Sequence, residues 1–306
     1  MDSLKSLIEL EFPKIKLVDV GAMLTTDQTR YKKLLAKDLV EVIGFEADEY
    51  QYLKLQLQDK KNTKYLNHCL GDGSKKNFYI TRYPGCSSLY EPNESVINLF
   101  TGISASEKGN FNVLNKKLIQ TKKLDDIIEA KNTDLLKIDT QGSELDILKS
   151  FSNNIKNTLI IESEVEFVEI YKNQPLFSDV SNFLKEKGFI LHKLIDIGGR
   201  PFKPFTMKDN PAYPMSQLLW ADAIFIRDFT KIENFSDKDL LKTSLILHDM
   251  YDSYDLCYLM LSEYAKRTKK DLHIQYSQIL GKSKLELKFM NLKTDIDSTS
   301  FKSWYL

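Results

Sequence analysis

Acidic and amide side chains gather where an apolar segment of this chain ends. Asp139, Gln141 and Glu144 follow the mainly apolar run 135–138 and enter a helical pattern over 142–151. A buried strand, a tight turn and an amphipathic helix account for this order. In an open α/β sheet, ligands bind at the carboxyl ends of the strands. A carboxylate there can act as a general base, face a cationic centre or hold a divalent metal, so Asp139 is the first candidate site residue.

Two further polar residues close strand-like segments far upstream. Asp19 and Gly21 end the run 15–20, and Glu46 ends the run 42–45. Glycine has no Cβ, so Gly21 permits a ligand to approach the backbone closely, and Asp19 can accept a hydrogen bond from a cationic ligand group. An acid at the position of Glu46 is placed to bind both hydroxyls of a ribose. The alternative is that both acids end their strands in solvent.

The elements that position these residues alternate between strand and helix. We expect strands at 15–20, 39–45, 64–70, 77–81, 113–120, 135–139, 158–162, 189–194 and 219–226, and helices at 28–37, 48–57, 142–151 and 176–187. This alternation predicts an α/β fold with a doubly wound, mostly parallel sheet. After Arg227 the pattern becomes helical, so we expect one domain over 1–228 and a helical C-terminal extension over 229–306.

Several of these segments resemble the FkbM-like family of methyltransferases. The resemblance is carried by Leu136-Lys137-Ile138-Asp139-x-Gln141-Gly142-x-Glu144, by the acids of 162–166, by Ser87-Ser88-Leu89 and by 220–227. It implies a class I, Rossmann-like fold that uses S-adenosylmethionine to methylate an oxygen of a sugar, glycan or secondary metabolite. The cofactor-binding residues it implies are Asp19, Gly21, Glu46, Asp72 and Asp139. The catalytic residues it implies are Asp139, Glu144 and Glu164.

Some of these assignments have a plain structural alternative. Asp72 corresponds to an acid that binds the adenine amino group in many methyltransferases, but Asp-Gly also favours a simple turn. Glu144 stabilises the first turn of its helix whatever the chemistry. Glu164 follows the expected strand 158–162 and could point to water. If these carboxylates do converge with Asp139, then a divalent metal, another cation or raised pKa values must offset their repulsion.

Composition limits the classes of partner. The 43 basic and 43 acidic residues balance, so nothing favours nucleic acid, and no apolar run approaches the roughly 20 residues that span a bilayer. Three cysteines without a CxxC pair indicate neither a disulfide framework nor a structural zinc site. We expect a cytoplasmic enzyme with a small-molecule or glycan acceptor. The sequence leaves the oligomeric state and metal dependence open.

Two other functions fit the same sheet. One is a nucleotide-dependent oxidoreductase, although the GxGxxG motif is absent. The other is a non-catalytic methyltransferase-like scaffold or binding protein. The turn Gly21-Ala22-Met23-Leu24 lacks the further glycines that this family usually has, and such a loop could have lost the cofactor. Exposed leucines on the helical extension would favour this scaffold.

Overall fold

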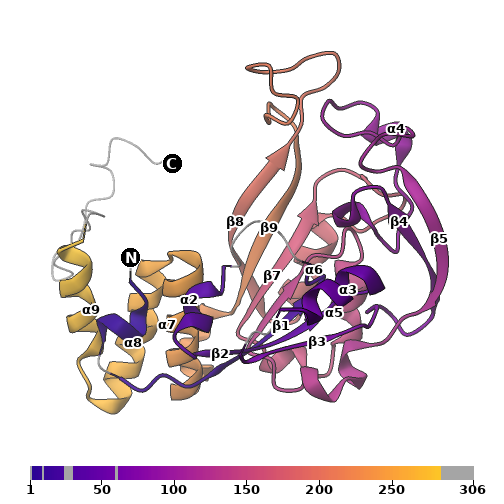
Figure 1. Cartoon of the computed structure of the whole chain (residues 1–306). Coiled ribbons are helices and arrows are strands. Elements are labelled where there is room, and N and C mark those ends of the chain that lie inside the picture. The colour runs from indigo at the N-terminus through magenta and orange to yellow at the C-terminus, as the bar shows by residue number, and fades with distance from the viewer. Residues whose placement is uncertain (1, 9, 24–29, 59–60, 284–306) are drawn as a thin grey trace.

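A seven-stranded sheet forms the centre of the molecule (Figure 1). The computed structural model describes residues 2–8, 10–23, 30–58 and 61–283. The strand order is β3-β2-β1-β6-β7-β9-β8, and β9 alone runs in the direction opposite to the other six strands. The bounds are β1 Ile15–Val20, β2 Val40–Phe45, β3 Thr63–Leu66, β6 Leu135–Ile138, β7 Ile160–Glu166, β8 Phe189–Gly199 and β9 Leu218–Arg227. The predicted fold class is confirmed.

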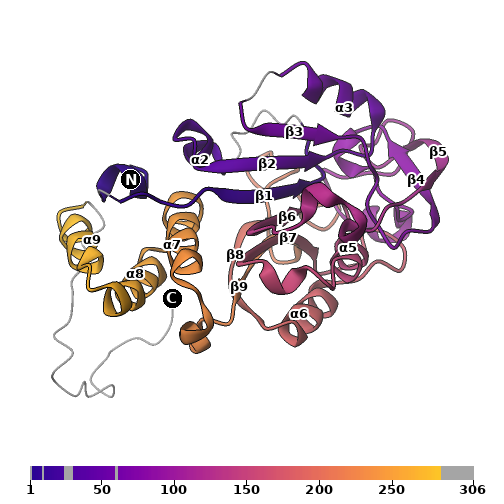
Figure 2. The same ribbon diagram turned by 90° about the horizontal axis from the view of Figure 1, so that it is seen from below.

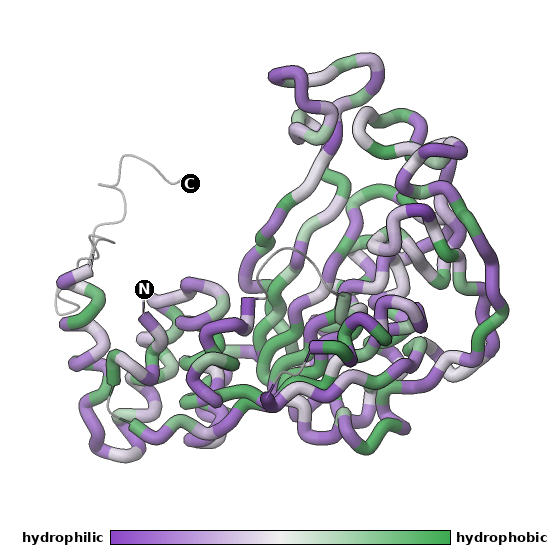
Figure 3. Tube along the Cα trace, viewed as in Figure 1, coloured by the Kyte–Doolittle hydropathy of each residue, from purple (hydrophilic) through white to green (hydrophobic). Residues whose placement is uncertain are grey.

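Helices cover both faces of this sheet (Figure 2). Alternate strand residues point to opposite faces, so Leu17 and Val18 belong to different apolar clusters. On the side of Val18 the sheet packs against α5 (Glu144–Ser150) and α6 (Phe177–Glu186). The cluster that contains Leu17 also holds residues of α1 (Leu4–Leu7), α2 (Lys32–Ala36), α7 (Asp237–Tyr251), α8 (Tyr254–Thr268) and α9 (Leu272–Gly281), with α8 packed on α7 and α9 packed on α8. Apolar residues concentrate along the strands, as Figure 3 shows.

A further helix and a separate hairpin lie beside the carboxyl ends of the parallel strands. The helix α3 (Glu49–Gln56) follows β2, and Asp48 caps it by accepting the Gln51 N–H at 2.9 Å. A separate hairpin of β4 (Lys75–Thr81) and β5 (Val113–Gln120) carries α4 (Glu94–Ile97) between its strands. Short 3₁₀ turns lie at Pro84–Cys86, Leu124–Asp126, Ile128–Ala130, Ile155–Asn157 and Phe229–Asn234.

Three strand ends differ from the sequence-based expectation. β7 continues to Glu166 rather than ending near 162, and β8 continues to Gly199 rather than 194. Both pair with the long strand β9, which supplies backbone partners as far as Trp220 opposite Glu166. β3 ends at Leu66 because its only partner, β2, ends opposite it at Phe45. The expected helix over 28–37 is described only from residue 30, and there it is the short α2.

The C-terminal helices share an apolar cluster with the sheet. Leu240 and Leu245 of α7 are fully buried in the cluster that holds Leu17 of β1. A buried ion pair joins Lys242 of α7 to Asp134, which also accepts the Lys16 N–H at 2.8 Å. The expected boundary at 228 falls between the end of β9 and the start of α7. Within the described ranges, none of the helices has the length and apolar character needed to cross a bilayer.

Candidate functional site

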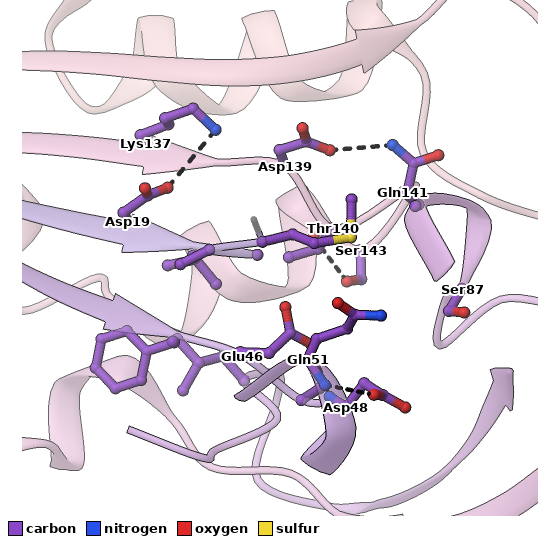
Figure 4. Close-up of a pocket in the computed structure, with 18 of the residues that line it drawn as sticks. Asp19, Glu46, Asp48, Gln51, Ser87, Lys137, Asp139, Thr140, Gln141 and Ser143 are labelled. Carbon is purple, nitrogen blue, oxygen red and sulfur yellow. Dashed lines mark hydrogen bonds and ion pairs between the residues drawn. The ribbon is translucent and has the colours of Figure 1, made fainter. Parts of the chain in front are cut away.

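A cavity of about 420 Å³ opens at the carboxyl ends of the parallel strands. Four of the predicted site residues line it together: Asp19 and Gly21 after β1, Glu46 after β2 and Asp139 after β6 (Figure 4). The parallel pairing of β2, β1 and β6 brings these ends to one edge of the sheet. The volume lies in the range of pockets that hold nucleoside-sized ligands, roughly 300–1,000 Å³. Residues from three separate strand ends therefore meet in one cavity.

The turn at Gly21 packs against the backbone of the neighbouring strand. Gly21 has a φ of +85°, and its N–H donates to the Phe45 carbonyl at 2.9 Å. A Cβ at this position would lie 1.8 Å from the carbonyl oxygen of Asp139. Only glycine fits here, because a side chain would suffer both the positive φ and the collision. The turn therefore leaves a smooth backbone surface beside the cavity.

Asp19 is buried with one oxygen unsatisfied. Its exposed fraction is 5%, and its Oδ2 accepts the Tyr31 hydroxyl at 2.9 Å. Its Oδ1 has no hydrogen-bond donor among the described residues, and the Lys137 ammonium lies 3.6 Å away. Burial and the charge of Asp19 raise the pKa of Tyr31, so this phenol remains a donor. A buried carboxylate oxygen that lacks a donor is suited to a ligand N–H group.

Glu46 lies at the opposite end of the cavity from Lys137 (Figure 4). Its Oε1 accepts the Asp48 N–H at 2.7 Å. Burial raises the pKa of Glu46 to about 7. His68, Cys69 and Leu70, which follow β3, line the same end of the cavity. The Glu46 carboxylate can accept hydrogen bonds from a ribose diol, and the side chains beside it can pack against a purine ring.

Asp72 does not line this cavity. Its carboxylate accepts the Ser74 hydroxyl at 2.6 Å and pairs with Lys76 at 3.1 Å. The hydrogen bond from Ser74 lowers the pKa of Asp72 to about 2. The structure therefore places this acid in the turn before β4, away from the other predicted cofactor-binding residues.

Glu144 holds the turn that carries Asp139. It is 2% exposed and does not line the cavity. Its carboxylate accepts the N–H groups of Thr140 at 2.8 Å and Gly142 at 2.9 Å. Burial raises the pKa of Glu144 to about 7. Between these anchors, Gln141 adopts a φ of +60°, so the turn depends on the contacts that Glu144 makes.

Behind Asp139 lies a group of buried acids. The Gln141 amide donates to Asp139 Oδ1 at 3.0 Å and also to Glu164. Glu164 and Glu166 lie within β7 rather than after it, because this strand pairs with β9 over its whole length. Burial, reinforced by the charge of Asp139, raises the pKa of Glu164 well above its usual value. Burial, reinforced by Glu144, does the same for the pKa of Glu166.

Two of the three expected ways to offset this repulsion are seen: the pKa values of Glu164 and Glu166 are raised, and the ammonium of Lys137 lies near Asp19. Across the described ranges, no group of three or more His, Cys, Asp or Glu side chains is arranged to hold a metal ion. Glu164 does not line the cavity, and it contacts Asp139 through the shared amide of Gln141.

The Ser-Ser-Leu element of the long loop lies over this turn. Ser87 and Leu89 line the cavity, and the Ser88 hydroxyl donates to the Gln141 carbonyl at 2.6 Å. Met23, next to the turn at Gly21, lines the cavity as well. Leu24, the other residue of the atypical loop, lies outside the described residues.

Sequence reasoning missed a charged wall on the far side of Asp139. Arg30 lines the cavity and forms ion pairs with one carboxylate on each of three strands: Glu162 of β7, Asp196 of β8 and Asp222 of β9. The Tyr251 hydroxyl of α7 donates to Glu162 at 2.7 Å. Burial raises the pKa of Asp222.

One of the missed residues left a signal in the sequence. Lys137 is a charged residue inside an apolar strand, two positions before Asp139, so both side chains must share a face of the sheet. Arg30 carries no comparable pattern, because its partners come from three distant strands. His192, which could have served as a base, lies outside the cavity lining and contacts the Ser253 hydroxyl at 2.7 Å.

The cavity therefore combines two chemistries. One end offers the Glu46 carboxylate, and the other offers the unsatisfied carboxylate of Asp19, the ammonium of Lys137 and Asp139. Such a site can bind an adenosine-linked amino acid and can face a hydroxyl group with a carboxylate.

Comparison with known proteins gives one family. The model of the methyltransferase FkbM domain matches residues 19–191, which is more than half of the chain. No curated protein matches the sequence significantly.

Two solved structures are distantly similar. A precorrin-6y C5,15-methyltransferase from Geobacter metallireducens GS-15 has 11% identity and a TM-score of 0.34, over 72% of this chain and 84% of that chain. A protein from Thermoplasma acidophilum, described as a possible methyltransferase, has 10% identity and a TM-score of 0.35, over 71% and 69%.

Proposed function

Because this chain belongs to the FkbM methyltransferase family, we propose that it transfers a methyl group from S-adenosylmethionine to an oxygen atom. The observation that carries the proposal is the convergence of Asp19, Gly21, Glu46 and Asp139 on one cavity. The acceptor that we propose is a hydroxyl group of a sugar, glycan or other secondary metabolite.

The residues present fit the cofactor. The unsatisfied Oδ1 of Asp19 suits the methionine ammonium, and Gly21 presents bare backbone beside it. The carboxylate of Glu46 would accept the ribose hydroxyls, and His68 to Leu70 would flank the adenine. When bound, S-adenosylmethionine supplies an electrophilic methyl group on a sulfonium centre.

The chain's own residues would orient the acceptor and receive its proton. Asp139 lines the cavity with Oδ1 already held by Gln141, which fixes the direction of its carboxylate. An acceptor hydroxyl next to Asp139 would lose its proton to this carboxylate as its oxygen bonds to the methyl group and the bond between that methyl group and the sulfonium sulfur breaks. Glu144 would keep the turn in place, and Glu164 would hold Gln141 from behind. Most of the rate enhancement would then come from positioning.

The scaffold alternative is disfavoured by the packing of the helical extension. The run from Leu240 to Tyr251 in α7 is buried, whereas a docking helix would present its leucines to solvent. The only large apolar side chains exposed on the described part of the extension are Leu259 and Ile274. The oxidoreductase alternative has no observation in its favour beyond the shape of the sheet.

Calorimetry with two ligands separates these functions. S-adenosylhomocysteine should bind the full chain, whereas NAD should release no heat. Glu46→Ala should weaken S-adenosylhomocysteine binding by roughly 1–3 kcal/mol, because the buried diol loses its acceptor. Glu41→Ala, which changes an exposed residue of the same strand, should leave the affinity unchanged.

Two outcomes would overturn the proposal. NAD binding in place of S-adenosylhomocysteine would make the chain an oxidoreductase, and the absence of heat with both ligands at millimolar concentration would favour a scaffold. Transfer of a labelled methyl group to a panel of methyl glycosides would then test the acceptor class. A label stable to mild base is expected for an ether.

A further inference from the structure

Asp19 and Lys137 form a charge pair at the floor of the cavity. They are direct register partners on the adjacent parallel strands β1 and β6, and both line the cavity. Their charged atoms, Asp19 Oδ1 and Lys137 Nζ, are 3.6 Å apart, as Figure 4 shows with a dashed line. This separation exceeds that of a normal N–H···O bond, so the two charges attract without saturating each other.

Each partner has unused hydrogen-bonding capacity. Asp19 Oδ1 is buried without a donor, and the side chain is only 7% exposed. An ammonium carries three N–H donors, and Lys137 makes no hydrogen bond to any other described residue. Burial lowers the pKa of Lys137, but the carboxylates around it, Asp19 foremost, raise it above the usual value, so the charge is retained. Buried charges in this state need further partners.

The second cation of the cavity is already saturated. The Arg30 guanidinium is held by the carboxylates of Glu162, Asp196 and Asp222. Among the described lining residues, Lys137 is therefore the basic side chain whose donors remain available to an anion.

We infer that Asp19 and Lys137 together form a receptor for the α-amino acid end of the cofactor, with Lys137 Nζ binding its carboxylate and Asp19 Oδ1 its ammonium. This inference rests on the proposed use of S-adenosylmethionine. The ligand's two charges are separated by only a few bond lengths, as are those of the protein pair. When the ligand's charge pair lies antiparallel to the protein's, each ligand charge meets a protein charge of opposite sign. The complex then buries no net charge.

A competing explanation gives Lys137 a purely internal role. Asp139, Glu162 and Asp222 also act on this ammonium, so it could serve only as their counter-ion. The two explanations differ in which part of the ligand the lysine senses. A receptor distinguishes ligands by their carboxylate, whereas a counter-ion responds only to their net charge.

Calorimetry with S-adenosylhomocysteine and two truncated probes tests the receptor. The probes are 5′-methylthioadenosine, which lacks the amino acid, and decarboxylated S-adenosylhomocysteine, which lacks only the carboxylate. Lys137→Met should weaken S-adenosylhomocysteine about tenfold or more, should change 5′-methylthioadenosine by less than about twofold, and should not weaken decarboxylated S-adenosylhomocysteine. Asp19→Asn should weaken both ligands that carry the ammonium and spare 5′-methylthioadenosine. Lys117→Met, on the exposed strand β5, is the matched control and should change nothing.

Several results would overturn the receptor. These are an unchanged affinity for S-adenosylhomocysteine in Lys137→Met, or an equal loss for all three ligands. If Lys137→Met does not fold, Lys137→Arg keeps the charge and should preserve the ratio of affinities for S-adenosylhomocysteine and 5′-methylthioadenosine. If the wild-type chain binds no adenosyl ligand, the proposed function itself has failed, and the receptor falls with it. Wild-type binding with equal affinity for all three ligands removes the receptor alone.

Discussion

The carbonyl oxygen of Asp139 lies where a β-carbon on Gly21 would have to sit, with 1.8 Å between the two positions. The turn after β1 and the turn after β6 are thus in direct backbone contact. Any side chain at Gly21 must push apart the two segments that would hold the methionine end of the cofactor and the acceptor.

Gly21→Ala should therefore impair both folding and binding. The positive φ and the collision predict a loss of roughly 2–4 kcal/mol in the free energy of unfolding. Affinity for S-adenosylhomocysteine should become undetectable by calorimetry. Gly188→Ala is the matched control, since Gly188 has a φ of +84° and nothing within 4 Å of its virtual Cβ. It should cost stability but leave binding intact, and equal binding losses in the two variants would contradict the collision argument.

The contact between Gly21 and Asp139 separates what could be predicted from the sequence from what could not. Asp19, Gly21 and Asp139 each end an apolar run, and strand ends meet at one edge of a parallel sheet, so their convergence was predictable. The collision between Gly21 and Asp139 was not, because it depends on distances between strands that are 118 positions apart. Arg30 was equally hidden, since its partners meet it only after β7, β8 and β9 have assembled.

The other differences between prediction and structure arise where a short stretch of sequence is compatible with two conformations. The sequence Asp72-Gly73 is compatible with either a turn or a ligand contact. In the structure, Asp72 contacts the neighbouring Ser74 and Lys76, which places it in a turn. The position of Glu164 after the expected strand 158–162 was compatible with exposure to water. In the structure β7 continues through Glu164 and Glu166, and β9 pairs with it along this whole length. Carboxyl groups that alternate along a strand are rarely buried together unless they stay protonated.

The raised pKa of Glu46 predicts that ligand binding depends on pH. A ribose diol donates hydrogen bonds, so it requires the ionised carboxylate. With a pKa of about 7, Glu46 is mostly protonated at pH 6. Affinity for S-adenosylhomocysteine should thus rise about tenfold per unit of pH below 7 and level off above it. Calorimetry between pH 5.5 and 8.5 measures this profile.

Glu46→Gln identifies the source of this profile. Glu144 also has a pKa of about 7, so it titrates in the same interval. If Glu46 is responsible, the glutamine variant binds weakly but with a flat profile. A profile that keeps its slope in the variant would assign the pH effect to another group. Without ligand, the stability that the protonated Glu46 contributes should decline between pH 4.5 and 7, because the folded protein holds its proton longer than the unfolded chain.

Removal of the Glu144 carboxylate should loosen the turn. Glu144→Ala leaves the N–H groups of Thr140 and Gly142 without their acceptor, which predicts a loss of roughly 2–4 kcal/mol in stability. Glu144→Gln retains one acceptor oxygen and should lose about half as much. Urea unfolding of both variants measures these losses. If the alanine variant is as stable as the wild type, then Glu144 does not support the turn.

The ion pair between Asp134 and Lys242 should hold the helical extension to the sheet. Lys242→Met leaves a buried carboxylate without its cation and should destabilise the fold by about 3–5 kcal/mol. The double variant Asp134→Asn/Lys242→Met removes both charges and should regain most of this loss. Thermal and urea unfolding of the three variants measure the coupling. Independent, additive losses would show that the two residues do not interact in solution.

The hydroxyl of Tyr251 reaches from α7 to Glu162 in the cavity wall, and Glu162 in turn pairs with Arg30. The described part of the helical extension, residues 229–283, therefore supports the wall opposite the proposed adenosine end of the cavity. A chimaera that keeps the sheet but not its helical extension would lack the Tyr251 hydrogen bond that supports this wall. Exchange of the helical bundle between related chains should then carry acceptor preference along with it, even though the bundle contributes few atoms to the cavity itself.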